Sequence, residues 1–112
     1  MDEVVFLYTT WPDALSAEAA GREAVEAGLC ACVNVLAPMT SVYRWKDVVE
    51  TAAETPMIVK TTTAAAKAAR DFLTARHPYD TPAVAALKIA PEGSSPAFLA
   101  WIAEESSAGR RR

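Results

Sequence analysis

The hydrophobic pattern begins with an uninterrupted apolar stretch near the start of the chain. Residues 4–9 read Val-Val-Phe-Leu-Tyr-Thr, a run rich in β-branched and aromatic side chains without polar alternation. Such a run is typical of a central strand that is covered on both faces. Residues 83–90 also carry apolar side chains at both parities, after the pair Thr81-Pro82. We therefore predict two buried strands.

Three other segments have the periodicity of amphipathic helices. Each is preceded by a residue whose side chain can cap a helix, namely Asp13, Thr63 and Ser95. The first helix has small residues along its apolar side and ends at Gly28, which lets the backbone leave the helix. The second covers residues 64–75, since Pro78 forbids its continuation, and the third begins at Pro96. The small side chains of the first helix predict a close approach to a sheet.

A long hairpin is predicted between the first two helices. Residues 29–37 are extended, Pro38-Met39 interrupts them, and residues 41–46 resume an alternating pattern. We interpret residues 46–54 as a polar turn region and residues 56–61 as the third strand. A two-stranded arm that extends beyond a small sheet is only marginally stable alone. We therefore expect the arm to pack on another surface.

The order of these elements is strand, helix, strand, strand, helix, strand and a final helix. Two βαβ-type halves of this kind produce an antiparallel four-stranded sheet with two helices on one face, the ferredoxin-like α+β arrangement. The chain has 112 residues, so one core and one domain are expected. We place that domain at residues 1–106 and expect residues 107–112 to be a disordered basic tail.

The predicted sheet has a second face that the first two helices leave open. Residues 4–8 and 83–89 are apolar at both parities, so this face must also be covered, and one short C-terminal helix is too small to cover it. At about 25 cal/mol per Å² of apolar surface, several hundred Å² left bare would forfeit several kcal/mol, which is comparable to the net stability of a small domain. We therefore predict a homo-oligomer.

Composition and charge restrict the possible partners. The chain is 52% hydrophobic and 22% charged, with a formal net charge of -3. This charge argues against a general phosphate-binding surface, so we expect no nucleic-acid partner. The opening apolar run is too short for a membrane span and its flank is acidic, so we expect no membrane association and a cytoplasmic protein. Cys30 and Cys32 are expected to be reduced, because two residues apart in an extended segment they fit no ordinary disulfide.

Five short strings in the sequence point to a known family. They are CACVNV at 30–35, SVYRW at 41–45, VKT at 59–61, HPYDTP at 77–82 and SPAFLAWI at 95–102. Any one of them is weak on its own, but all five occur in order and with matching spacing. Together they resemble the CutA family of divalent-cation tolerance proteins, and the resemblance runs from residue 4 to about residue 102.

The resemblance implies a ferredoxin-like subunit in a tight homotrimer, with long hairpins exchanged between neighbours. It also implies a role in divalent-cation tolerance, with copper, another divalent cation or a small ligand bound at clefts between subunits. The family is similar in shape to nitrogen-regulatory signal proteins, so the alternative is a trimeric signalling or scaffold protein with incidental metal binding. No catalytic activity is firmly attached to the family, and we expect a protein that is not an enzyme and needs no cofactor for folding.

The resemblance links copper to a first-strand cysteine and two histidines, and the matching positions here are Tyr8, Arg76 and His77. Only His77 among them is a good metal ligand, and Arg76 places a fixed positive charge where a cation would approach. Cys32 is the second candidate metal ligand, provided that the fold brings it to His77. The alternative interpretation of Cys32 is a small buried side chain on a central strand.

A second candidate site is a polar cleft between subunits. Its candidate residues are Tyr43, Trp45, Lys60, Tyr79 and Asp80, with His77 in the wall beside them. Several of these also have a purely structural interpretation. Tyr43 and Trp45 can lie in the core or an interface, Lys60 can face water, and His77 can cap the negative end of the second helix. Asp80 stands where most members of the family have Glu or Gln. Because the side chain of Asp is shorter, any polar contact that it makes would lie closer to the backbone.

Other functions of ferredoxin-like domains fit the residues less well. An RNA-recognition module needs aromatic residues within a basic, glycine-containing motif on its central strands, and neither 4–8 nor 56–61 supplies one. A copper-chaperone domain would carry C-x-x-C before its first helix, where this chain reads TTWPD. Cys32, His77 and Asp80 have the residue types that nucleophilic catalysis uses, but the sequence does not bring them together.

Overall fold

Five strands and three α-helices follow one another in residues 3–107, the part of the chain that this computed structural model describes. Their bounds are β1 Val4–Trp11, α1 Ala14–Glu26, β2 Cys32–Val35, β3 Met39–Trp45, β4 Val48–Thr62, α2 Thr63–Arg76, β5 Val84–Lys88 and α3 Pro96–Glu105, with a 3-10 turn at Pro91–Gly93. The predicted order of strands and helices is confirmed, except that the second predicted strand is divided into β2 and β3. The predicted basic tail falls mainly on residues 108–112, which lie outside the described residues.

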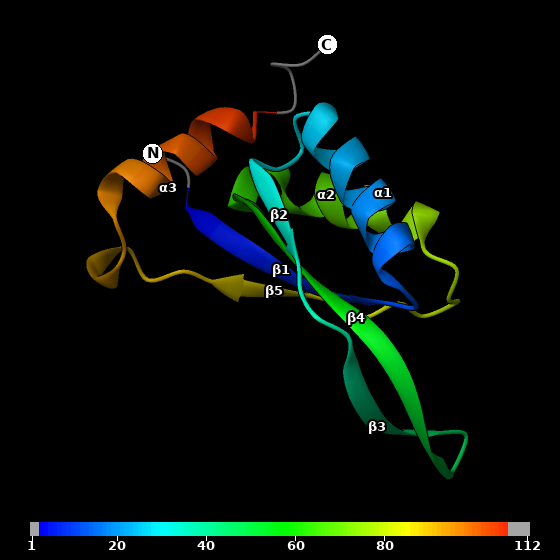
Figure 1. Ribbon diagram of the computed structural model, residues 1–112. Coiled ribbons are helices and arrows are strands. Elements are labelled where there is room, and N and C mark those ends of the chain that lie inside the picture. Colours follow the sequence, from blue (N-terminus) through cyan, green and yellow to red (C-terminus); the bar gives the residue numbers. More distant parts are fainter. Residues whose placement is uncertain (1–2, 108–112) are drawn as a thin grey trace.

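The sheet has the strand order β2-β4-β1-β5, and every pair in it is antiparallel. β3 pairs with the first half of β4, and this hairpin projects from the sheet as an arm (Figure 1). The helices α1 and α2 lie together on one face of the sheet, and α3 lies near the start of β1. The ferredoxin-like α+β fold is therefore confirmed.

The main core lies between the sheet and the two helices α1 and α2. Leu7, Met57 and Val59 enter it from the central strands, and all three are buried. The apolar stripe of α1 consists of small residues, as predicted. A Cβ atom added at Gly21 would lie 2.7 Å from Cγ2 of Val33 and 2.9 Å from Sδ of Met57. Gly21 therefore sets how closely the helix approaches the sheet.

Side-chain caps fix where the helices begin. Asp13 and Ser95 accept hydrogen bonds from the first turns of α1 and α3, so these two predicted caps are confirmed. The predicted cap of α2 is wrong by one residue. Thr62 Oγ1 accepts the hydrogen bond from Ala65 N at 3.3 Å, whereas the Thr63 hydroxyl donates to the carbonyl oxygen of Glu3. The reason is that β4 runs directly into α2, and Thr62 is the last residue with an extended backbone.

The arm differs from the prediction in its second half. Residues 48–54 are not a polar turn region but the first half of β4, which is 15 residues long. The turn itself is restricted to Lys46 and Asp47, whose φ angles are 50° and 67°. A two-residue turn with both φ angles positive matches the twist of an antiparallel hairpin. Both faces of this arm are largely exposed in the single subunit, so its strand has no buried face with the apolar alternation that would distinguish it from a loop.

The second face of the sheet is covered only at one end. Leu7 faces the helices, so its neighbour Phe6 and the residue opposite it, Leu87, point to the other side. Ile102 of α3 is buried against Val4 and Ala31 at the end of this face. Leu87, beyond the helix, is 50% exposed. The expectation that one short helix leaves apolar sheet uncovered is met in the single subunit.

Within residues 3–107, no helix is long and apolar enough to cross a lipid bilayer.

Candidate functional site

A groove runs between the arm and the segment that follows α2. Its volume is about 670 Å³. Aromatic, acidic and small residues line it: Thr10, Tyr43, Arg44, Trp45, Glu50, Ala52, Glu54, Pro78, Tyr79, Asp80, Thr81 and Ala83. Four of the five residues predicted for a ligand cleft, Tyr43, Trp45, Tyr79 and Asp80, are in this lining. The structure therefore brings together residues that lie more than 30 positions apart in the sequence.

The register of the arm explains one wall of the groove. Tyr43 lies opposite Glu50, and Trp45 lies opposite Val48. Side chains directly opposite each other in an antiparallel pair share a face, as do residues two apart on one strand. Tyr43, Trp45, Glu50 and Glu54 consequently point to the same side of the arm. Tyr43 is 41% exposed and Trp45 is 51% exposed, so both rings are available to a ligand or to another subunit.

The other wall is built around His77. The backbone N–H of His77 donates to Thr74 O and ends α2. The ring then uses both of its nitrogens: Nε2 donates to the carbonyl oxygen of Thr10 at 2.7 Å, and Nδ1 accepts the N–H of Tyr79 at 3.1 Å. The ring also lies between those of Trp11 and Tyr79 in tilted contacts, with centroid distances of 4.2 Å and 4.8 Å. His77 therefore connects β1 to the segment that carries Tyr79 and Asp80.

One structural interpretation of His77 needs correction. Its ring does not reach the last carbonyl groups of α2; it reaches Thr10 instead. Arg76 supplies the expected contact, because its Nη1 donates to Phe72 O at 3.2 Å. The guanidinium of Arg76 also lies over the Phe72 ring and forms an ion pair with Glu23. His77 is a corner of the chain whose side chain positions a wall of the groove.

The groove has a negative electrostatic character. Three of its lining residues are carboxylates, Glu50, Glu54 and Asp80, and Arg44 is its one basic residue. Desolvation raises the pKa of the Tyr43 hydroxyl, and the charge of Glu50 and a hydrogen bond to it raise that pKa further. Desolvation also raises the pKa of Tyr79, followed by the charge of Glu54. Both phenols therefore remain protonated and neutral around physiological pH.

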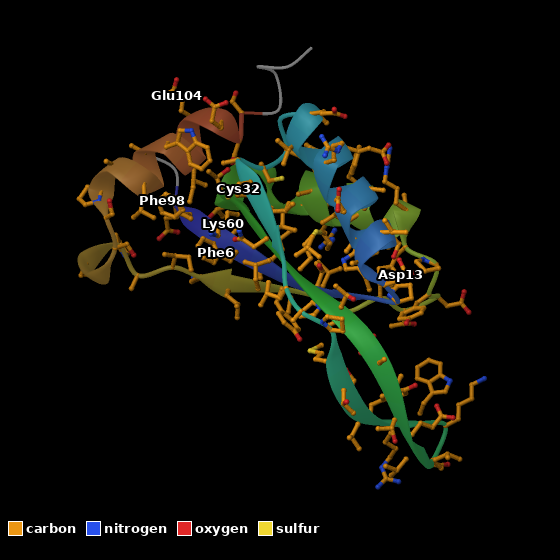
Figure 2. All side chains as sticks on the ribbon, viewed as in Figure 1. Phe6, Asp13, Cys32, Lys60, Phe98 and Glu104 are labelled. Carbon is orange, nitrogen blue, oxygen red and sulfur yellow. The ribbon has the colours of Figure 1, made fainter. Side chains whose placement is uncertain are left out.

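Lys60 does not belong to the groove lining, in contrast to the prediction. It lies opposite Cys32 on β2 and Phe6 on β1. Its Nζ atom is 5.4 Å from the centroid of the Phe6 ring and 5.3 Å from that of Phe98 on α3. Figure 2 shows these four side chains near the start of β1, away from the arm. The charge of Lys60 is thus placed against two aromatic rings.

The two candidate metal ligands do not meet in one subunit. Cys32 lies across β4 from Phe6, whereas His77 contacts Thr10, four residues further along β1 and therefore about 13 Å away along the strand. Burial raises the pKa of Cys32, and the charge of Lys60 opposes that shift only in part. In the described range 3–107, no group of three or more His, Cys, Asp or Glu side chains is arranged to hold a metal ion.

The remaining cysteine and the two positions that replace copper ligands have other contacts. Cys30 is buried in the main core, and burial raises its pKa to about 12. The hydroxyl of Tyr8 donates to Sδ of Met39 at 3.9 Å. Arg76 is engaged with Phe72 and Glu23, as described above. None of these three side chains supplies a metal ligand to the groove.

Sequence reasoning missed the acidic residues of the groove. Glu50 and Glu54 fall in the predicted turn region at 46–54, and Thr10 follows the predicted first strand, although all three belong to strands. The signal that could have found Glu50 is the two-residue Lys46-Asp47 turn. Once that turn is recognised, counting back along both strands places Glu50 directly opposite Tyr43.

Comparison with known proteins agrees with the fold and the motifs. The family model described as "CutA1 divalent ion tolerance protein" matches residues 5–105. The divalent-cation tolerance protein CutA of Thermus thermophilus is 39% identical over 106 residues, which cover 95% of this chain and 99% of that protein. Protein CutA of Mus musculus is 35% identical over 95 residues, 85% of this chain, and the chain spans only 52% of the mouse protein.

Solved structures give the same result. The crystal structure of CutA from Xylella fastidiosa superimposes with a TM-score of 0.89 at 35% sequence identity, covering 94% of this chain and 99% of that one. The similarity thus includes the sheet, the helices and the arm. This chain belongs to the CutA1 family of divalent ion tolerance proteins.

Proposed function

We propose that the protein contributes to divalent-cation tolerance as a homotrimer that binds a divalent cation or a small ligand in the groove between the arm and the segment after α2. The observation that carries this proposal is the convergence of Tyr43, Trp45, Tyr79 and Asp80 on one groove. Aromatic rings beside a few convergent polar groups are typical of ligand sites. In the assembled protein, neighbouring subunits complete the groove.

The uncovered surfaces of the single subunit support assembly. Leu87, Phe98 and Trp101 are exposed on or beside the open face of the sheet, and Val42 and Val49 are exposed on the arm. Exposed apolar residues that gather in this way mark contact sites between proteins. A homotrimer would cover the open face and the arm together. The cysteines are free in the subunit, which agrees with the cytoplasmic location included in this proposal.

Catalysis is not part of the proposal. A nucleophilic mechanism needs a thiolate or an activated hydroxyl beside a base. The pKa of both thiols is raised, so they favour the protonated form. Both ring nitrogens of His77 are engaged with backbone groups. Cys32, considered above for such chemistry, also lies away from His77, so its thiol does not have that imidazole as a base.

Two measurements test the proposal. Sedimentation at dilute protein concentration should give a trimer. In cells that lack their own copy, the wild-type gene should restore growth under copper stress. Glu54→Gln removes one groove carboxylate and should weaken this rescue, whereas the control Glu92→Gln, on the 3-10 turn outside the groove lining, should not. A folded monomer, or full rescue by Glu54→Gln, would contradict the proposal.

The alternative, a trimeric signalling protein that binds a small ligand, is favoured by one observation. The described residues contain no ready-made cluster of metal ligands. Calorimetric titration with copper at neutral pH separates the two functions. Stoichiometric binding that is lost in Asp80→Asn supports direct metal binding in the groove. Absent or unchanged binding favours the signalling function.

A further inference from the structure

We propose that the ligand of the groove is a small organic cation with an ammonium or guanidinium head, held between aromatic rings and carboxylates. The inference rests on the proposed function, because it requires the groove to be the ligand site. It goes further by naming the chemical class of the ligand. The residues that carry it are Tyr43, Trp45 and Tyr79 together with Glu50, Glu54 and Asp80.

The aromatic rings provide the first argument. A cation over the face of Trp or Tyr is attracted by the ring quadrupole, and sites that recognise organic ammonium groups combine several such rings. Trp45 already has this contact: the Nζ atom of Lys46 lies 5.9 Å from its ring centroid. Lys46 is exposed at the tip of the arm, so a ligand cation can take the place of its ammonium group over the ring. The face of Trp45 is therefore suited to a cation.

The carboxylates provide the second argument. Glu50, Glu54 and Asp80 give the groove three negative charges against the one positive charge of Arg44. Desolvation is the main cause of the raised pKa of Tyr43 and of Tyr79, and the charge of Glu54 adds to the shift of both hydroxyls. Its field therefore extends across the groove from the arm to the opposite wall. A ligand cation in the space between the two tyrosines would lie within this field.

Size and donor chemistry favour an organic cation over a bare metal ion. The groove has a volume of about 670 Å³, within the range of about 300 to 1,000 Å³ that is typical of small-molecule pockets. Hard divalent ions require several oxygen ligands at short distance. The carboxylates in residues 3–107 form no such set, and neutral phenols and an indole add no anionic ligand. The rings match the apolar surface of an alkylated ammonium group better than a hydrated metal ion.

The wall opposite the arm is fixed before any ligand binds. His77 accepts a hydrogen bond from the backbone N–H of Tyr79 and contacts the Tyr79 ring in a tilted arrangement. Its second nitrogen attaches it to Thr10 on β1. The ring of Tyr79 is thus tied to the sheet, so that less conformational entropy is lost when a ligand binds.

The test compares cations with a neutral molecule of the same shape. Choline and methylguanidinium are titrated into the trimeric protein by calorimetry, and 3,3-dimethylbutan-1-ol, the neutral carbon isostere of choline, serves as the control. At least one of the two cations should bind at least tenfold more tightly than the isostere. Tyr79→Leu should lower its affinity about tenfold, and Tyr79→Phe, which keeps the ring, should preserve most of it. Glu54→Gln should weaken binding, whereas Glu92→Gln should not. Sedimentation of each variant shows that the trimer is retained.

The outcomes separate this inference from the proposed function. Equal binding of choline, methylguanidinium and the neutral isostere would overturn the organic-cation class and leave the groove as a ligand site. Binding of copper without binding of either organic cation would do the same. Cation binding that is unaffected by both Tyr79→Leu and Glu54→Gln would place the ligand elsewhere and overturn the inference. An intact trimer that binds neither the cations nor copper would count against the inference and the proposed function alike.

Discussion

Replacement of His77 tests how the groove is held in place. His77→Ala removes the hydrogen bond to Thr10 O, the acceptor for Tyr79 N–H, and the ring contact with Trp11. A partly buried hydrogen bond contributes about 1 kcal/mol and the aromatic contact about 0.5 to 1.5 kcal/mol, while the exposed bond to Tyr79 contributes less. The expected loss of unfolding free energy is therefore about 1.5 to 3 kcal/mol per subunit.

His77→Phe divides this loss into its parts. Phenylalanine keeps a ring over Trp11 but has no nitrogen for Thr10 or Tyr79. We expect it to recover the contribution of the ring contact with Trp11 and none of the hydrogen bonding, so its stability should lie between those of the wild type and His77→Ala. Urea unfolding at one fixed protomer concentration measures the difference, since the stability of an oligomer depends on concentration.

A binding measurement distinguishes a positioning role from a merely structural one. Because both variants release Tyr79 from the sheet, both should bind the groove's ligand more weakly than the wild type. Titration with choline provides this readout. The assignment of His77 as the residue that positions the groove wall is refuted by two results together: a free energy of unfolding of His77→Ala within about 0.5 kcal/mol of the wild type, and an equal affinity for choline.

Three further predictions concern stability. Gly21→Ala should destabilise the protein by about 1 to 3 kcal/mol, measured by urea unfolding, because the new methyl group would overlap Val33 and Met57; an unchanged midpoint would show that α1 can move. Asp47→Gly should raise the melting temperature, since its φ of 67° suits glycine, and a lower value would contradict the turn geometry. Burial raises the pKa of the Cys30 thiol from 9.0 to about 12, so the stability that the neutral buried thiol contributes is fully present below pH 9 and is lost as pH rises towards 12. Melting curves recorded at increasing pH should therefore show less alkaline destabilisation for Cys30→Ala than for the wild type.

Local signals predicted most of the fold. Asp13 and Ser95 cap their helices as expected, because a cap depends only on the residues of one turn. The apolar runs also indicated both strands. β1 is largely buried as predicted, whereas β5 is shorter than predicted and largely exposed in the single subunit. Residues 48–54 were misjudged because strand polarity reflects what covers a strand, and in the single subunit both faces of the arm are largely exposed.

The candidate site depended on contacts that a sequence pattern does not contain. Tyr43 and Tyr79 could be selected as polar aromatics, but their neighbour Glu54 became visible only with the register of the arm. The surroundings of Lys60 likewise depend on contacts between elements that are distant in the sequence. Its partners Phe6 and Phe98 come from distant elements, and strand alternation does not indicate that α3 brings a ring to this position.

The continuity of β4 has a consequence for the order of folding. The first half of this strand forms a hairpin with β3 across a two-residue turn. The second half pairs with β1, which lies at the N-terminal end of the chain. Local hairpins close in about 1 to 10 μs, and pairings between distant segments are slower because a long loop must first be ordered. The arm, although largely exposed within one subunit, therefore has the shortest path to formation. It can present β4 as a ready template on which the N-terminal strand docks.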